Sequence, residues 1–419
     1  MFYGWRLLAV LAFVYFLSIG SIFYGFSVVM PQMIEATGWS RAQASGGFSV
    51  VTLALGFGGP LVAYLIRRFS ARLTMTVGGG VIALATTWLY FTDGLTAFYI
   101  GLAILGVGMA MQTVIPGTQL ITNWFTKRRG LAIGIFMGAS GLGAFVAAPT
   151  YVWVIEQYGD WKIVWGLMGA SALISSLAIA IVVRDRPEDV GTFIDGIDPA
   201  TIEEPGETKT EVVSRSKVFR STETWTVKEA IRTSTFWIIV LAAAMAVLGS
   251  MIVSSQAVLH MKDLGLSQVI AAAALGISGL VGTFGRLASG GLADRFDPRF
   301  MLAGGLFLEL IGICMLAYAD TTMMAYACAA VFGLGYGLAS VSSPSLIANY
   351  FGPSSYAPLF ATRGVMVTVL GASGPILVGA AYDATNSYNA SFFTYSALAC
   401  VFVVLAFWIK PPVKKQVAV

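Results

Sequence analysis

The sequence is short of charge: only 11% of its 419 residues are Asp, Glu, Lys or Arg, whereas 57% are hydrophobic. A soluble domain carries about 25% charged and about 45–50% apolar residues. With a mean hydropathy of +0.80, the chain cannot cover a water-facing surface with its own side chains. This composition excludes a soluble enzyme and a nucleic-acid-binding protein, and it predicts a protein embedded in lipid.

Metal-binding and nucleophilic residues are equally scarce. The chain has one histidine and three cysteines, and Cys314, Cys328 and Cys400 lie in apolar runs without metal-ligand spacing. The glycines at 138–143 resemble a dinucleotide loop only superficially, because they lie inside an apolar run with no strand before it. Close helix packing explains them better. We therefore expect no enzyme activity, no cofactor and no metal, and an ion or substrate gradient as the source of energy.

Long apolar runs dominate the rest of the chain. A bilayer core is crossed by roughly 20 apolar residues, and the first such run, after Arg6, is too long for a signal peptide. The runs predict an all-α integral membrane protein with two six-helix bundles, 1–184 and 233–419, joined by a cytoplasmic linker at 185–232. The twelve predicted spans are 7–30, 42–66, 74–92, 97–121, 130–154, 162–184, 234–259, 269–293, 300–319, 323–347, 357–382 and 390–409.

Basic residues gather on one side of the predicted spans. With the N-terminus in the cytoplasm, 21 of the 25 basic residues lie on the cytoplasmic side, and only Arg41, Lys162 and Lys262 lie outside. This bias follows the positive-inside rule, so we expect a multi-pass protein with both termini in the cytoplasm, in a prokaryotic plasma (inner) membrane. Near the end of the linker, Thr226 and Glu229 have the spacing of a capping box and predict a short helix.

The two halves repeat each other at an offset of about 226–227 residues. Gly38-Trp39-Ser40 corresponds to Gly265-Leu266-Ser267, and Asn123-Trp124-Phe125 corresponds to Asn349-Tyr350-Phe351. A parallel six-plus-six repeat predicts a substrate site between the halves near the midplane, reached from either side as the halves rock. A receptor or a membrane enzyme on the same bundle is the alternative outside this class. We expect a functional monomer whose partners are a small solute and lipid.

One loop motif resembles a known superfamily. Gly291-Leu-Ala-Asp-Arg295, followed by Arg299, resembles the signature loop of the major facilitator superfamily. The corresponding segment of the first half, 59–72, keeps the basic residues but has Arg67 where that superfamily usually has Asp. The resemblance implies a role in conformational change for Arg68, Arg72, Asp294, Arg295 and Arg299.

Other segments narrow the resemblance. Residues 3–5, 38–42 and 124–134 are similar to segments of the monocarboxylate transporter family and its bacterial relatives, which include oxalate–formate exchangers. Asp263-Leu264-Gly265 and Gly285-Arg286 add to this similarity. The resemblance extends over nearly all twelve predicted spans, and it implies a small organic anion as the substrate.

Two charged residues lie deep in predicted spans. A charge at the centre of a spanning helix costs about 2.5–3.5 kcal/mol on insertion scales, so such residues are functional candidates. Arg286 offers a planar fork that binds a carboxylate with two hydrogen bonds, and the resemblance implies the same role. Glu309 is a candidate to carry a coupling proton or to neutralise Arg286, with a purely structural role as the alternative. His260, at the outer end of its span, is a second proton candidate, or an interfacial histidine.

Polar side chains on apolar helices form the next group of candidates. Tyr336 and Ser340 lie one turn apart, and the resemblance implies that both line the substrate cavity. Pro116 predicts a bend in the fourth span. Hydrogen bonds in helix packing are the alternative use of such side chains. The substrate-binding candidates of this group are Tyr24, Gln112, Thr113, Gln256, Tyr336 and Ser340.

Departures from the family pattern limit the mechanism. The animal proton-linked branch has an Asp where this chain has Gly282, and a Lys in the first span near the position of Ser27. Exchangers of the oxalate–formate type carry a Lys in the eleventh span, whereas residues 364–376 here hold no charge and Arg363 is expected at the cytoplasmic end. One central cation favours one carboxylate. We therefore expect a secondary transporter of a small monocarboxylate such as lactate or pyruvate, coupled to protons. An organic anion exchanger is the alternative.

Overall fold

A computed structural model of the chain describes residues 2–197, 219, 221, 225–292, 296–352 and 355–414. Every regular element within these residues is a helix. Eleven helices are long and apolar enough to cross a membrane, and α3 with α4, which meet at a bend of 41°, make a twelfth if the pair is one span. The prediction of an all-helical protein with twelve spans is therefore confirmed.

The first six spans are built from ten helical elements, because three of the spans are broken. They are α1 (Tyr3–Tyr15), η1 (Phe16–Phe23), α2 (Tyr24–Thr37), α3 (Arg41–Phe57), α4 (Gly59–Arg68), α5 (Ala71–Phe91), α6 (Leu95–Gln112), α7 (Val114–Trp124), α8 (Arg129–Tyr158) and α9 (Ile163–Val182).

Short elements follow, and then six continuous spans. The short ones are η2 (Pro187–Val190), η3 (Ile194–Gly196) and α10 (Val227–Ala230), and the spans are α11 (Ser234–Asp263), α12 (Gln268–Leu292), α13 (Pro298–Leu316), α14 (Thr322–Phe351), α15 (Tyr356–Thr385) and α16 (Asn389–Phe407). The capping box predicted at Thr226 and Glu229 is confirmed at the start of α10. The predicted boundaries at 184 and 233 stay predictions, and most of the predicted linker lies outside the described residues.

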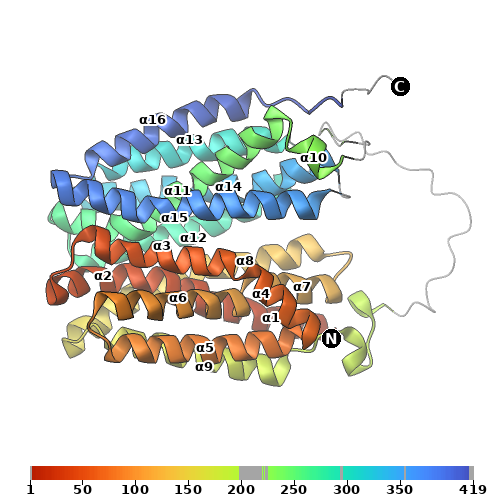
Figure 1. The fold of residues 1–419 in the computed structure, drawn as a ribbon, viewed down its shortest axis with the longest axis horizontal. Helices are drawn as coiled ribbons and strands as arrows, with labels where there is room; N and C mark the ends of the chain where they lie inside the picture. The colour runs from red at the N-terminus through yellow and green to blue at the C-terminus, as the bar shows by residue number, and fades with distance from the viewer. Residues whose placement is uncertain are drawn as a thin grey trace, which may run out of the picture.

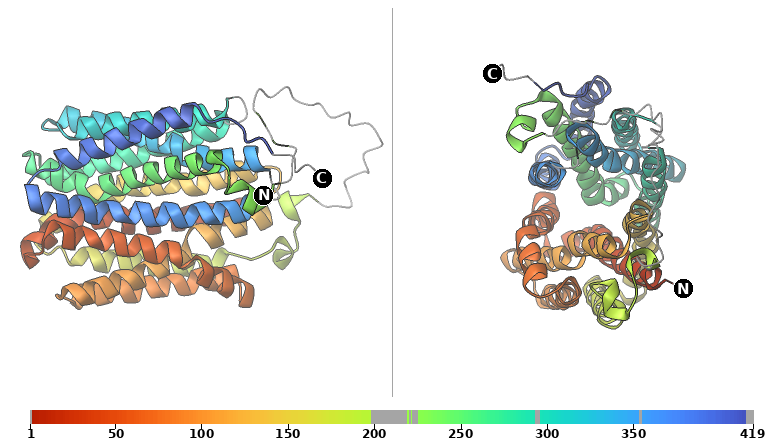
Figure 2. Two further views of the ribbon diagram at one scale, coloured as in Figure 1. Left: turned by 45° about the horizontal axis from the view of Figure 1, so that its top comes forward. Right: turned by 90° about the vertical axis from the view of Figure 1, so that its right-hand side faces the viewer.

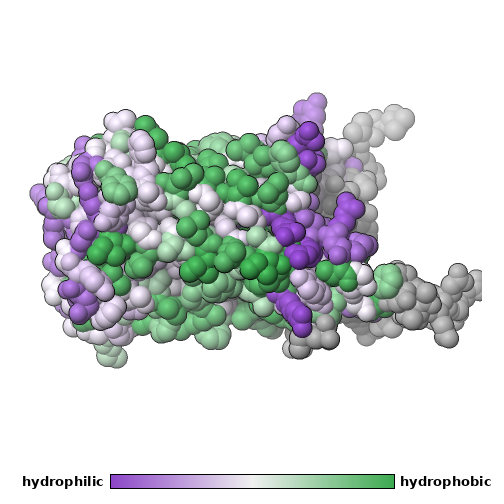
Figure 3. Space-filling view, turned by 90° about the horizontal axis from the view of Figure 1, so that it is seen from below, coloured by the Kyte–Doolittle hydropathy of each residue, from purple (hydrophilic) through white to green (hydrophobic). Residues whose placement is uncertain are grey.

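The helices run side by side, with the first half on one side and the second half on the other (Figure 1; Figure 2, right). The start of α1 and the end of α16 lie at the same end of the bundle (Figure 1). We name this the terminal end, where α1 begins and α16 ends, and the opposite end, where α2 ends and α3 begins, the distal end. Hydrophobic residues cover the middle of the surface and hydrophilic residues gather toward both ends (Figure 3). This pattern fits a bilayer around the middle of the bundle.

The first span contains a wide turn in its middle. η1 is a π-helix that separates α1 from α2. Its Gly20 lies against the backbone of Gly143 in α8, so closely that a Cβ atom on Gly20 would collide with it. Such π segments often occur at functional sites, and this one has Tyr15 at one end and Tyr24 at the other.

The bend predicted in the fourth span occurs three residues before the proline. α6 ends at Gln112, and Thr113 has φ −112° and ψ −116° before α7 begins. Pro116 has no N–H to donate to the carbonyl of Gln112, and its ring crowds that carbonyl. The helix is therefore interrupted at the turn that loses this hydrogen bond.

Two helix pairs supply most of the contact between the halves: α8 packs on α12, and α3 packs on α15. Small residues let these helices approach closely. Gly141 of α8 lies against the carbonyl of Gly279 in α12, and a Cβ atom on Gly276 would lie 2.9 Å from the Cα atom of Phe145. The close helix packing predicted for the glycines at 138–143 is confirmed.

Glycines also join α12 to α14 within the second half. A Cβ atom on Gly337 would lie 2.8 Å from the Cα atom of Gly285 and 3.0 Å from the backbone nitrogen of Arg286. These contacts are with backbone atoms, which cannot move aside cheaply. The spacing of the two helices at Arg286 is therefore set by the absence of a side chain at Gly337.

We predict that Gly337→Ala destabilises the protein by about 1–3 kcal/mol, because the added methyl group forces α12 away from α14. The measurement is the midpoint of thermal unfolding in detergent, followed by tryptophan fluorescence. Gly304→Ala in α13 is the control, since a Cβ atom there meets nothing within 4 Å and Ala favours a helix. An unfolding midpoint of Gly337→Ala equal to that of the control would contradict this account.

Candidate functional site

Arg286 lies on α12, six residues before the helix ends at Leu292, or about 9 Å from that end at 1.5 Å per residue. The centre of its guanidinium group lies 5.4 Å from the centroid of the Tyr336 ring on α14. One of its terminal nitrogens, Nη1, is buried without a hydrogen-bond partner. A guanidinium nitrogen is a hydrogen-bond donor, and among the residues that the structure describes this one has no acceptor.

Two tyrosines of the first span face the same cation. Tyr15 and Tyr24, at the two ends of η1, both interact electrostatically with Arg286 and with Tyr336. The first span belongs to the first half, whereas α12 and α14 belong to the second. The group Tyr15, Tyr24, Arg286 and Tyr336 is therefore assembled from both halves, and we refer to it as the central cluster.

A second cation of this region, Arg363, is buried. Arg363 on α15 has only 9% of its surface exposed, and its Nε donates a 2.8 Å hydrogen bond to the hydroxyl of Ser343 on α14. Its guanidinium group lies 5.2 Å from the centroid of the Phe360 ring and interacts electrostatically with Tyr336 and Tyr356. Tyr336 thus lies within electrostatic range of both arginines.

The position of Arg363 corrects the sequence analysis. We expected this residue at the cytoplasmic end of its span and inferred that the site has one cation. Arg363 is instead buried seven residues into α15, about 10 Å from the helix start. The sequence already placed Arg363 inside the predicted span 357–382. The position of a charge along the chain, however, does not show which way its side chain faces.

Neither arginine has an acidic partner in the part of the chain that the structure describes. The ion pairs found there involve other basic residues. The one buried acidic residue among those described is Glu309, with none of its surface exposed. It accepts a 3.2 Å hydrogen bond from the hydroxyl of Tyr395 on α16, and its Oε1 has no partner.

Glu309 lies in the second half, among α11, α13 and α16. A Cβ atom on Gly249 of α11 would lie 3.1 Å from its carboxylate. It therefore does not neutralise Arg286 in this conformation, as one of its two predicted roles would require. It remains a buried carboxyl group with one oxygen available for a proton.

The remaining polar candidates divide between different regions. Ser340 is one turn from Tyr336 and donates a 2.9 Å hydrogen bond to the carbonyl of Gly337 within α14. Gln112 and Thr113 lie at the break between α6 and α7, where Gln112 accepts a 2.8 Å hydrogen bond from Ser18 of η1. Thr113 donates to a carbonyl of its own helix. Ser340 is therefore placed beside the central cluster, whereas Gln112 and Thr113 are engaged inside the first half.

Gln256 and His260 lie toward the distal end of α11. Gln256 accepts a 3.0 Å hydrogen bond from the Tyr388 hydroxyl and donates to the carbonyl of Pro375 at 3.1 Å. A ring nitrogen of His260 lies 3.0 Å from the carbonyl oxygen of Leu316. Both side chains are engaged with groups of the second half at this end, and not with the central cluster.

Residues predicted to act in conformational change lie at the terminal end. Arg299 forms a 3.4 Å ion pair with Asp297, and Arg72 donates a hydrogen bond to the carbonyl of Ala180. Arg68 lies over the ring of Phe69, which follows it. Each of these contacts lies within one half. The other two members of this group, Asp294 and Arg295, lie outside the described residues.

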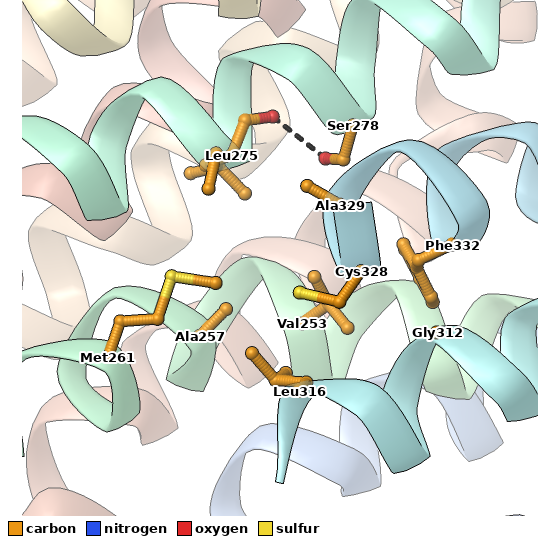
Figure 4. A pocket seen from close by; sticks show the side chains of 11 residues that line it. Val253, Ala257, Met261, Leu275, Ser278, Gly312, Leu316, Cys328, Ala329 and Phe332 are labelled. Carbon is orange, nitrogen blue, oxygen red and sulfur yellow. Dashed lines mark hydrogen bonds between the residues drawn. The ribbon is translucent and has the colours of Figure 1, made fainter. Parts of the chain in front are cut away.

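A separate small cavity lies inside the second half, between α11, α12, α13 and α14. Its lining is mostly apolar, with Val253, Leu275, Cys328 and Phe332 around it (Figure 4). Its volume is about 20 Å³, close to that of a single water probe. It is therefore too small to hold an organic anion.

The fold and sequence agree with one superfamily of transporters. Residues 8–354 and 289–418 match the Major Facilitator Superfamily. The fold is similar to the crystal structure of a bacterial homolog of the human lysosomal transporter Spinster, in an inward-facing and unoccupied conformation. The TM-score is 0.70 at 18% sequence identity, over 96% of this chain and 95% of that one.

Curated relatives extend along almost the whole chain. Monocarboxylate transporter 13 of Bos taurus is 25% identical over 398 residues, which are 93% of this chain and 85% of the relative. The oxalate:formate antiporter of Oxalobacter formigenes is 21% identical over 422 residues, with 97% and 93% covered. The match to the superfamily covers most of the chain, and the similarity to transporters that was expected from the motifs is confirmed. The chain belongs to the Major Facilitator Superfamily, and it is a multi-pass secondary transporter rather than an enzyme.

Proposed function

We propose that this transporter moves a small organic anion, in the first place a monocarboxylate, by alternating access. The observation that carries the proposal is a pair of arginines that both interact with Tyr336 and have no acidic partner among the described residues. Arg286 is partly buried and has a buried Nη1 without a hydrogen-bond partner, and Arg363 is buried. A buried charge without a partner is costly in an apolar interior. A carboxylate substrate offsets that cost when it binds.

Arg286 is the group proposed to hold the carboxylate. Its buried Nη1 is a free donor, and a guanidinium fork matches the two oxygens of a carboxylate. The hydroxyls of Tyr24 and Tyr336 surround the same cation, and each can donate a hydrogen bond to an anion. The relatives support this substrate class, since several of them are monocarboxylate transporters.

The halves 1–184 and 233–419 are the units proposed to rock about the central cluster. We further propose that both termini face the cytoplasm of a prokaryotic cell, because the basic residues gather at the terminal end. The distal end then faces outward. Since the central cluster contains groups from both halves, rocking changes which side of the membrane the bound anion can reach.

Proton coupling is proposed through Glu309, whose Oε1 is buried without a partner. A carboxylate in an apolar interior without a cation is costly, and binding a proton removes that cost. His260 is the weaker candidate, since its ring is already engaged with the carbonyl of Leu316.

Anion exchange is the second candidate, and Arg363 favours it. With two cations that have no acidic partner among the described residues, the empty site carries more uncompensated charge than one arginine would leave, which raises the cost of reorienting without a substrate. A transporter of this kind changes conformation readily only when an anion is bound. The oxalate:formate antiporter among the relatives carries out exchange by name.

We predict that Arg286→Ala lowers uptake of labelled lactate or pyruvate into proteoliposomes by at least about 30-fold, because removing one partner of a buried charge pair costs about 2–5 kcal/mol. Arg286→Lys keeps the charge but loses the two-pronged guanidinium group, so its uptake should fall between that of the wild type and that of Arg286→Ala. The exposed Arg6→Ala is the matched control for loss of a positive charge. Uptake by Arg286→Ala equal to that of the control would rule out this assignment.

We predict that Arg363→Gln lowers the ratio of oxalate uptake to formate uptake by at least about tenfold, because the second carboxylate of oxalate loses its cation. Arg363→Lys, which keeps the charge, should reduce this difference. Uptake is measured with each acid separately in vesicles preloaded with the same acid. Equal losses for the two acids would show that Arg363 does not select between one and two carboxylates.

We predict that Glu309→Gln abolishes the stimulation of uptake by an inward proton gradient into empty vesicles and leaves exchange against a preload at wild-type rates. Gln keeps the volume and the acceptor for Tyr395, but it cannot take up a proton. His260→Gln serves as the comparison and should retain the stimulation. If Glu309→Gln keeps full stimulation, the proton is carried elsewhere.

A further inference from the structure

Arg41 begins α3 at the distal end, and its side chain reaches into the other half. Its two terminal nitrogens donate to the two carboxylate oxygens of Asp263, at the end of α11, over 2.6 and 2.7 Å. The same guanidinium group donates a 2.6 Å hydrogen bond to the hydroxyl of Tyr388. Two-pronged contacts between Arg and a carboxylate are among the strongest polar contacts in proteins.

The backbone of the same residue is also held by the second half. The carboxylate of Asp383 on α15 accepts hydrogen bonds of 2.9 Å from the backbone N–H groups of Arg41 and Ala42. These groups open α3, where a negative charge is favourable. The Arg41 guanidinium group lies 3.8 Å from the centroid of the Tyr382 ring, within range of a cation–π interaction.

The contacts continue inward from Arg41 toward the middle of the bundle. Tyr388 donates to Gln256, and Gln256 donates to the carbonyl of Pro375. That carbonyl also accepts a 2.8 Å hydrogen bond from Ser45, one turn beyond Arg41 on α3. The start of α3 is thus tied to α11, α15 and the residue that precedes α16.

Neighbouring contacts at the distal end have the same character. Lys262 of α11 forms a 3.3 Å ion pair with Glu35 of α2, and Gln268 of α12 donates to the carbonyl of Val28 at 2.9 Å. In the described part of the chain, the polar contacts between the halves lie at this end or partway along the helices, where Thr283 donates to the carbonyl of Gly138. Separation of the halves at the distal end has to break the contacts of Arg41.

We propose that Arg41, with Asp263, Asp383, Tyr382 and Tyr388, is the latch that holds the halves together at the distal end and sets how often the transporter opens there. This inference rests on the alternating access proposed above. The Asp263 side chain is 33% exposed and that of Arg41 16% exposed, so water can replace the broken contacts as the halves part. The contacts of the latch favour the closed distal end, and their exposure to water allows them to break when the halves separate.

The test measures opening at the distal end without any substrate. Ser27 is 1% exposed, and it donates a hydrogen bond to the carbonyl of Ser254 in the other half. For the test, Ser27 is changed to Cys in a variant whose three native cysteines are replaced by Ala. The rate of maleimide labelling in nanodiscs then reports how often this contact opens. Arg41→Ala and Asp263→Asn should each speed labelling by about tenfold, since the fraction of open molecules follows the free energy lost. The double change Arg41→Asp with Asp263→Arg should restore part of the protection.

The matched control is an ion pair at the same end within one half. Lys162 and Asp93 pair inside the first half, so Lys162→Ala should leave the labelling of Ser27→Cys unchanged. Labelling of Arg41→Ala and Asp263→Asn at the wild-type rate would overturn the latch. Asp263→Asn keeps the size of the side chain, which guards against loss of the fold, and its unfolding midpoint is measured alongside. Because the readout needs no anion, its failure is distinct from failure of the substrate assignment.

Discussion

A positive charge between apolar helices, without a negative partner among the described residues, is the constraint around which the middle of this protein is organised. Arg286 has a buried nitrogen with no acceptor, and Arg363 is anchored by a single side-chain hydrogen bond through Nε. In lipid-embedded helices such charges are expensive unless something compensates them. The surrounding tyrosines supply polarity but no charge. No acidic side chain among the described residues pairs with either arginine.

The placement of that charge depends on glycine. Gly285 and Gly337 let α12 and α14 come together backbone to backbone, so that Arg286 lies beside Tyr336. Gly20 and Gly143 do the same for η1 and α8, and so position the tyrosines at the ends of η1. The same small residues at α8 and α12 join the two halves. Packing through small residues thus builds the helix contacts and the central cluster at once.

The polar contacts between the halves are concentrated at the distal end. Arg41 has two carboxylates and two aromatic rings of the other half around it. An ion pair that is partly exposed is worth less than a buried one and is released at lower cost. The central cluster and the contacts at the distal end therefore differ in kind: among the described residues Arg286 has no acidic partner, whereas Arg41 is paired with Asp263.

The sequence by itself determined the twelve spans and the superfamily, and it singled out Arg286 as a candidate, because hydrophobicity along the chain and a charge inside a span are local properties. It also predicted the bend in the fourth span, although the break lies at Thr113 because Pro116 acts on the turn before it. The tertiary structure alone decided which polar residues meet. In the folded chain Arg363 is buried, Gln112 is hydrogen-bonded to Ser18, and Gln256 is hydrogen-bonded to Tyr388. Such partners come from helices far apart in sequence, and the direction in which each helix faces is set by packing that no linear pattern records.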